Sequence, residues 1–151
     1  MRHSLALAIA IALATPAVAK TTRTDADVRW KAWEQHQQLE QSSLFGGLKW
    51  RSIGPTVQGG RIVDIEVHPS EPYTFYVAYA SGGVWKTSNN GVTFKPLSDG
   101  LPTMISGDIA IDPQAPETLW VGTGDPNSSR SSYSGLGVFV SRDGGASFEH
   151  A

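Results

Sequence analysis

The chain has 151 residues, a formal net charge of −2 at pH 7 and no cysteine. Without disulfides its stability must come from packing and hydrogen bonds, and its near-neutral charge, with no basic stripe, argues against a nucleic-acid partner. Its 16 glycines and 9 prolines are typical of short strands joined by tight turns.

The first predicted element is an export signal. Met1-Arg2-His3-Ser4 precedes an apolar run over residues 5–14, and the small-residue tripeptide Ala17-Val18-Ala19 follows. This order predicts a signal peptide over residues 1–19. The apolar run is too short to span a bilayer, which needs about 20 apolar residues. We therefore expect a periplasmic or extracellular chain with no membrane span after cleavage.

A short helix is expected within the next segment, residues 20–47, which also contains a linker. The helix runs from Asp25 to about Gln41, because residues 25–43 contain neither Gly nor Pro, and Thr24 with Asp27 resembles a capping box. One helix face carries apolar residues at helical spacing, which favours packing against the body of the domain. These residues are Ala26, Trp30 and Trp33.

Two copies of a sequence repeat follow. Residues 65–78 align without gaps with residues 109–122, and after an insertion residues 83–94 align with residues 137–148. Each copy reads as four short strands, and four strands in about 44 residues match one propeller blade. We predict an all-β fold in which residues 48–151 form about two four-stranded antiparallel blades of a β-propeller, with the ring incomplete.

The turn between the third and fourth strands has the same polar pattern in both copies. In such a turn an Asn or Asp side chain accepts backbone N–H groups, a Gly supplies a positive φ, and the aromatic residue returns to the core. The pattern therefore indicates fold and not catalysis. Its residues are Thr87, Asn89, Gly91, Thr93 and Phe94 in the first copy, and Ser141, Asp143, Gly145, Ser147 and Phe148 in the second.

This turn resembles the Asp box of bacterial-neuraminidase-type repeats. From Trp50 to Phe148 the chain is similar to the first blades of secreted Asp-box propellers, which include sortilin-type ectodomains, xyloglucanases and sialidases. Residues 50–55, 59–61, 68–69 and 81–87 resemble those of exported glycosyl-hydrolase-like repeat proteins, which have many more blades. The resemblance implies an N-terminal fragment whose partners include the missing C-terminal blades, because a ring typically needs about four to eight blades. Residues 48–53 would be a fourth, outermost strand without inner strands of its own.

The candidate binding surface is a loop rim. In a blade whose strands run outward from the central channel, the loops at residues 54–61, 80–83, 98–106 and 124–136 share one face. The rim residues chosen to hydrogen-bond or stack on a sugar or peptide are Gln58, Arg61, Ser81, Asp125, Arg130 and Tyr133. In the competing interpretation Asp125 caps a turn, Arg130 is a solvated charge and Tyr133 packs the loop down.

No catalytic constellation is visible. A glycosidase needs two carboxylates across the scissile bond, but Ser81 precedes Gly82-Gly83 where the resembling xyloglucanases carry a catalytic Asp. Arg61-Ile62 precedes Val63, which departs from the Arg-Ile-Pro motif of sialidases. Acidic residues of the repeats are assigned to local hydrogen bonding: Asp64, Glu66, Asp108 and Asp112. The histidines are scattered, so we expect no metal and no cofactor.

Three functional hypotheses follow. The favoured one is an exported propeller segment that binds a glycan or an extracytoplasmic protein through its loop rim. The alternative is the N-terminal part of a xyloglucanase-like or sialidase-like glycoside hydrolase, with catalytic carboxylates in the missing blades. The third is a short β protein that associates with copies of itself, because an unclosed array of blades leaves strand edges and apolar faces exposed.

Overall fold

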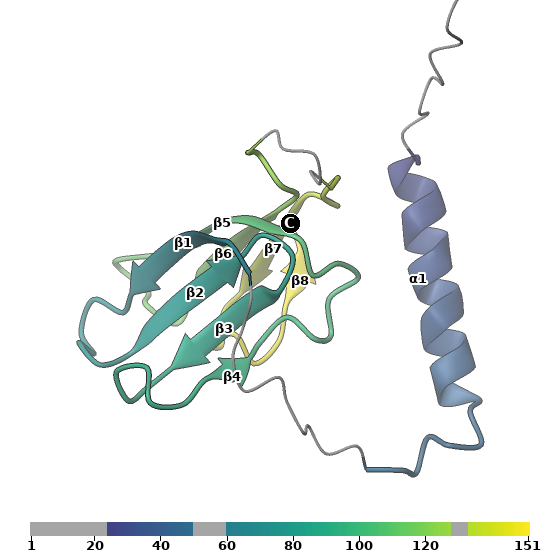
Figure 1. Cartoon of the computed structure of the whole chain (residues 1–151), viewed down its shortest axis with the longest axis horizontal. Coiled ribbons are helices and arrows are strands. Elements are labelled where there is room, and N and C mark those ends of the chain that lie inside the picture. The colour runs from purple at the N-terminus through teal and green to yellow at the C-terminus, as the bar shows by residue number, and fades with distance from the viewer. Residues whose placement is uncertain (1–23, 50–59, 128–132) are drawn as a thin grey trace, which may run out of the picture.

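The computed structural model describes residues 24–49, 60–127 and 133–151, and shows one helix and two four-stranded sheets (Figure 1). The predicted signal peptide over residues 1–19 lies outside the described residues, as does most of the outer strand expected at residues 48–53. Within the described residues, no helix is long and apolar enough to cross a membrane.

The helix α1 spans Ala26–Gln41, close to its predicted range. The predicted capping box is wrong, because Asp25 and not Thr24 occupies the N-cap, and no side chain caps the helix there. Thr24 is therefore one residue too early to reach the free N–H groups of the first turn. At the other end, the Ser42 hydroxyl donates to the carbonyl of Gln38 at 2.9 Å.

Each sequence repeat forms one antiparallel sheet. The first sheet contains β1 (Ile62–Val67), β2 (Phe75–Tyr79), β3 (Gly83–Thr87) and β4 (Lys95–Pro96). The second contains β5 (Ser106–Ile111), β6 (Leu119–Thr123), β7 (Val138–Ser141) and β8 (Glu149–His150). In both sheets every strand pairs with its neighbours along the chain. The antiparallel four-stranded units predicted from the repeat are thus confirmed.

The repeat extends to an irregularity of the backbone. Register shifts occur between Ile62 and Asp64 in β1 and between Ser106 and Asp108 in β5, at equivalent positions of the two copies. A bulge of this kind leaves a residue unpaired and increases the local twist. The two sheets share this irregularity and stack face to face (Figure 1), as neighbouring propeller blades do.

The main core lies between the two sheets. Alternate residues of each strand point to one face, and six of these side chains form a fully enclosed cluster: Tyr76, Ala78 and Val84 from the first sheet, and Ile109, Leu119 and Val121 from the second. Burial of each large side chain contributes roughly 1.5–3 kcal/mol. This interface fixes the second sheet on the first.

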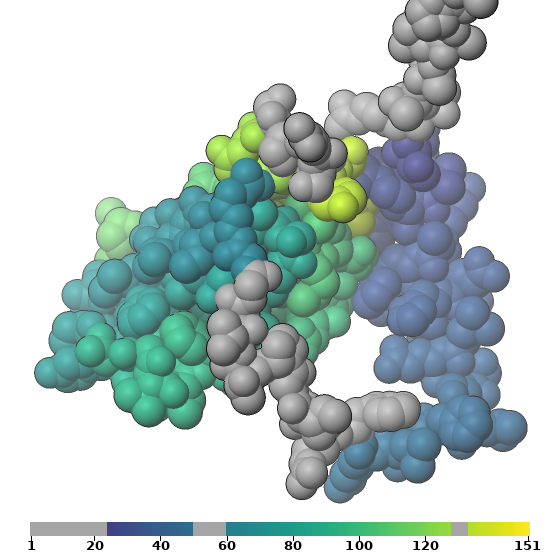
Figure 2. Space-filling view, in the orientation of Figure 1, coloured from purple at the N-terminus to yellow at the C-terminus, as the bar shows by residue number. Residues whose placement is uncertain are grey.

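A second cluster attaches α1 to the second sheet. Trp30 packs against Leu101, Leu136 and Phe139, and its ring centroid lies 6.1 Å from that of Phe139. Ala26, which was expected on the same apolar face, is exposed. In the space-filling view the helix meets the body of the sheets along its upper part, and a gap separates the two farther down (Figure 2).

Candidate functional site

An ion pair joins two rim loops. Arg61, just before β1, contacts Asp125, just after β6, with 2.5 Å between Nη2 and Oδ2. The Asp125 side chain is 3% exposed, and its other oxygen accepts the N–H of Asn127 at 3.0 Å. The structure therefore brings Arg61 and Asp125 together, but it gives Asp125 the turn-capping role of the competing interpretation.

The loop after β6 is held at its base by Thr123. The Thr123 hydroxyl donates to the carbonyl of Gly137 at 2.5 Å and accepts the N–H of Leu136 at 2.7 Å. Above it, the N–H of Asp125 donates to the carbonyl of Tyr133 at 3.0 Å. These bonds fix the backbone of Tyr133 relative to the sheet, so its side chain projects from a defined position.

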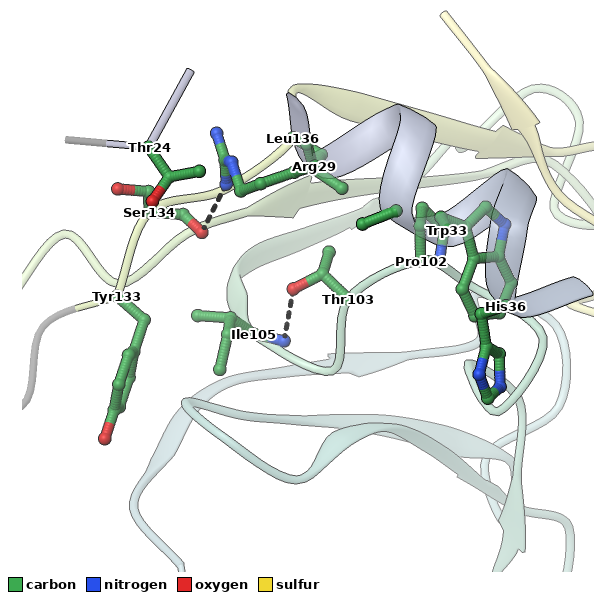
Figure 3. Close-up of a pocket in the computed structure, with 11 residues that line it drawn as sticks. Thr24, Arg29, Trp33, His36, Pro102, Thr103, Ile105, Tyr133, Ser134 and Leu136 are labelled. Atoms are coloured by element: carbon green, nitrogen blue, oxygen red, sulfur yellow. Dashed lines mark hydrogen bonds between the residues drawn. The ribbon is translucent and has the colours of Figure 1, made fainter. Parts of the chain in front are cut away.

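A cavity of about 660 Å³ lies between α1 and the rim loops (Figure 3). Tyr133 stands on one side, Trp33 and His36 stand on the other, and Thr103 and Ile105 lie between them. Tyr133 is 55% exposed. The cavity is lined by Thr24, Arg29, Ala32, Trp33, His36, Pro102, Thr103, Ile105, Tyr133, Ser134 and Leu136.

Polar groups of the cavity are few and mostly held in place. The Nη1 of Arg29 donates a hydrogen bond to the carbonyl of Ser134 at 3.2 Å, and this bond joins the helix to the rim. The buried Arg29 Nε has no hydrogen-bond partner among the described residues. The Thr103 hydroxyl accepts the N–H of Ile105 at 3.2 Å, and His36 stacks on Trp33 with ring centroids 5.6 Å apart. No carboxylate is among the described residues that line the cavity.

The structure places the predicted rim residues differently with respect to the cavity. Gln58 and Arg130 lie outside the described residues. Of the four that the structure describes, Tyr133 lines the cavity, whereas Arg61, Ser81 and Asp125 do not. Sequence reasoning missed the contribution of α1, namely Arg29, Trp33 and His36. The available signal was Trp33, an aromatic residue on the helix face that the core does not fully cover.

Three carboxylates lie together on the inner strands. Asp64 Oδ1 accepts the N–H of Ile65 at 2.8 Å, and Asp108 Oδ1 accepts that of Ile109 at 3.0 Å. Asp64 Oδ2 also accepts the Ile109 N–H at 3.2 Å, so Asp108 bonds to its neighbour in the chain whereas Asp64 also links β1 to β5. A side-chain hydrogen bond with Asp64, burial and the charge of Asp64 together raise the pKa of Asp108. Burial, followed by the charges of Asp64 and Asp108, raises the pKa of Glu66. Among the described residues, no group of three His, Cys, Asp or Glu is placed to hold a metal ion.

The β7–β8 turn is a closed hydrogen-bond network. The Ser141 hydroxyl donates to Asp143 Oδ1 at 2.7 Å and accepts the N–H of Gly145 at 2.8 Å. The Ser147 N–H donates to Asp143 Oδ1 at 2.9 Å, and its hydroxyl donates to Oδ2. Hydrogen bonds from the Ser147 hydroxyl, the Ser147 N–H and the Ser141 hydroxyl lower the pKa of Asp143 far below its usual range. Every acceptor of Asp143 is thereby directed at the turn itself.

The β3–β4 turn repeats this network with one bond reversed. Thr87 donates to Asn89 Oδ1 at 3.0 Å and accepts the N–H of Gly91 at 2.9 Å. The Thr93 N–H donates to Asn89 Oδ1 at 2.9 Å, but Asn89 Nδ2 now donates to the Thr93 hydroxyl at 2.8 Å. A hydroxyl can donate or accept, so Asn and Asp serve the same turn. Phe94, expected to return to the core, is 40% exposed, because the second described sheet does not cover that face of the first.

Comparisons with known proteins give a partial fold likeness. No family model matches the sequence, and no curated protein matches it. Solved structures similar to the chain include an ancestral GH74 enzyme, 23% identical over 61% of this chain and 10% of that chain, with a TM-score of 0.48. The GH74 enzyme of Niastella koreensis is 19% identical over 57% of this chain and 13% of that chain, with a TM-score of 0.44. The GH74 xyloglucanase from Xanthomonas campestris is 13% identical over 61% and 15%, with a TM-score of 0.44. The chain thus spans a small part of the length of these proteins.

Proposed function

We propose that the chain is an exported segment of an Asp-box β-propeller that binds a glycan in the cavity between α1 and the loop rim. Residues 1–19 serve as its signal peptide, the two networked turns are its Asp boxes, and the two sheets are its first blades. The observation that carries the binding role is the pair of aromatic side chains, Trp33 and Tyr133, on opposite walls of one cavity.

The chemistry of the cavity suits a sugar. Ligand sites are concave and mostly apolar, with a few placed polar groups that fix orientation. An aromatic ring covers the apolar C–H face of a pyranose, and two rings that face each other accommodate a flat sugar between them. Around these rings, Thr103, His36 and the Arg29 guanidinium supply groups of the kind that hydrogen-bond sugar hydroxyls.

Binding, and not hydrolysis, is the activity proposed for this cavity. Glycoside hydrolysis uses two carboxyl groups on either side of the bond that breaks. The described lining residues bring none, and the rim residue Asp125 is already engaged by Arg61. A hydrolase would therefore have to draw its carboxylates from sheets other than the two described.

The proposal is tested by titration calorimetry of the purified chain with a neutral xyloglucan oligosaccharide. We expect measurable binding that Tyr133→Ala and Trp33→Ala each weaken by about tenfold, since an aromatic contact contributes about 1 kcal/mol and 1.4 kcal/mol is tenfold. Circular dichroism of each variant verifies that the sheets remain folded.

Tyr73→Ala is the matched control, because Tyr73 is also an exposed tyrosine, 65% accessible, but lies in the β1–β2 turn away from the cavity. Its affinity should equal that of the unchanged chain. The glycan proposal fails if no neutral oligosaccharide binds, or if all three variants bind equally well.

A further inference from the structure

The same positions of the repeat are buried in one sheet and exposed in the other. Ile109 in β5 is 2% exposed, whereas its counterpart Ile65 in β1 is 50% exposed. Conversely, Tyr76 and Val84 in the first sheet are fully buried, whereas their counterparts Trp120 and Val138 in the second are 41% and 42% exposed. The difference therefore lies in whether a neighbouring sheet covers the position, and not in the residue type.

The face of the first sheet that turns away from the second sheet is apolar. Register places Ile65 beside Val77, Val67 beside Phe75, and Val77 beside Trp85 on this face. Phe94 joins it from the β3–β4 turn, with its ring centroid 6.0 Å from that of Phe75. Ile65, Val67 and Phe94 are exposed, Phe75 and Trp85 are partly exposed, and Val77 is buried. We call this surface the front face: Ile65, Val67, Phe75, Val77, Trp85 and Phe94.

The second sheet has an apolar surface on the side that turns away from the first sheet. Trp120 lies beside Ala110 and Val140, and Gly122 lies beside Val138. Ala110, Trp120 and Val138 are exposed, Gly122 is partly exposed, and Val140 is buried. We call this surface the back face: Ala110, Trp120, Gly122, Val138 and Val140. The interface between the two sheets already joins these two kinds of surface. The second sheet contributes its front-face positions, Ile109, Leu119 and Val121. They pack on the back-face positions of the first sheet, Tyr76, Ala78 and Val84. Each chain therefore has one exposed front face and one exposed back face, which are the two kinds of surface that meet between its own sheets.

We propose that the back face of one copy of this chain receives the front face of a second copy, so that copies assemble head to tail with the geometry of the internal interface. We infer a second copy as the occupant because of its front face. That face has apolar side chains at the repeat positions that, in the second sheet, cover the back-face positions of the first. The contact is heterologous, since the two surfaces differ, and a heterologous contact closes into a ring when its rotation permits.

The back-face side chains are the expected anchors. Trp120 is a large aromatic on an exposed sheet face, and buried aromatic residues dominate the binding energy of interfaces. Continuity with the internal core means that the join buries the same kind of surface as the one between β1–β4 and β5–β8. This assembly is independent of the cavity at α1, so either proposal can fail without the other.

Sedimentation velocity over a range of chain concentrations tests the proposal. We expect the average mass of the chain in solution to rise with concentration. Ile65→Lys blocks the front face and Val138→Lys blocks the back face, and each should raise the dissociation constant by about tenfold or more. Val92→Lys is the control, because Val92 is 80% exposed in the β3–β4 turn and lies on neither face.

Mixing the two blocked variants separates this contact from others. Ile65→Lys keeps its back face and Val138→Lys keeps its front face, so the mixture should form a dimer and stop there, while each variant alone stays monomeric. This complementation also shows that both variants are folded. The proposal is overturned if the unchanged chain is monomeric at every concentration, if blocked variants assemble as it does, or if the mixture forms no dimer.

Discussion

The burial difference between equivalent isoleucines predicts two unequal mutational effects. Ile109→Ala removes a side chain enclosed between the sheets, and such a truncation lowers the free energy of unfolding by about 3 kcal/mol, within a range of roughly 2–5. Ile65→Ala removes the same atoms from a half-exposed site. Water fills the space there, so the cost is only the transfer of half a side chain, about 1 kcal/mol.

Urea denaturation followed by tryptophan fluorescence measures both effects, at a concentration where the chain is monomeric. The difference of about 2 kcal/mol between the variants is the quantity of interest. Equal losses for the two variants would refute the reasoning, because they would mean that the front face is already covered in the isolated chain. At concentrations where copies assemble, the cost of Ile65→Ala should rise toward that of Ile109→Ala.

Three further predictions concern polar groups. Folding lowers the pKa of Asp143, so the stability that this residue contributes is present above its unfolded pKa of 3.8 and is lost as pH falls below that value. Asp143→Asn should retain the turn, as Asn89 does. The melting temperature of this variant should therefore lose that part of its dependence on acid pH. The raised pKa of Asp108 has the opposite sign, because stability falls as pH rises through the folded pKa; Asp108→Asn should raise the melting temperature at pH 7 but not at pH 3. His68 Nδ1 accepts the N–H of Ser70 at 3.4 Å, as Asp112 does for its own turn, so His68→Ala should destabilise the chain by about 1 kcal/mol and His68→Asn by less in urea titration.

Much of the fold could be predicted from the sequence because the two repeats have the same pattern of strands and turns. Residues 65–78 and 109–122 obey the same alternation, and a pattern written twice identifies the strands and their faces together. The helix range was equally accessible, since residues 25–43 contain no breaker. The N-cap residue of the helix could not be predicted in the same way. Thr24 and Asp25 are both good N-cap residues, and only the backbone conformation of Asp25 decides between them.

The cavity was beyond sequence reasoning for a different reason. Its walls come from α1, from the loop after β4 and from the loop after β6, which are far apart along the chain. Pattern analysis assigned Tyr133 to a rim loop, but nothing local shows that Trp33 stands opposite it. The ion pair between Arg61 and Asp125 was likewise hidden, since it spans 64 residues of sequence and depends on how the two sheets stack.

The carboxylates of β1 bear on how this strand could pair with another chain. Within the described sheet β1 is an edge strand, and its exposed apolar residues, Ile62, Ile65 and Val67, would favour the addition of another extended segment. Asp64 and Glu66 place negative charge on the same strand. An incoming copy of β1 would bring carboxylate against carboxylate, an arrangement that disfavours pairing. The two acidic residues therefore oppose fibril-like growth from this edge.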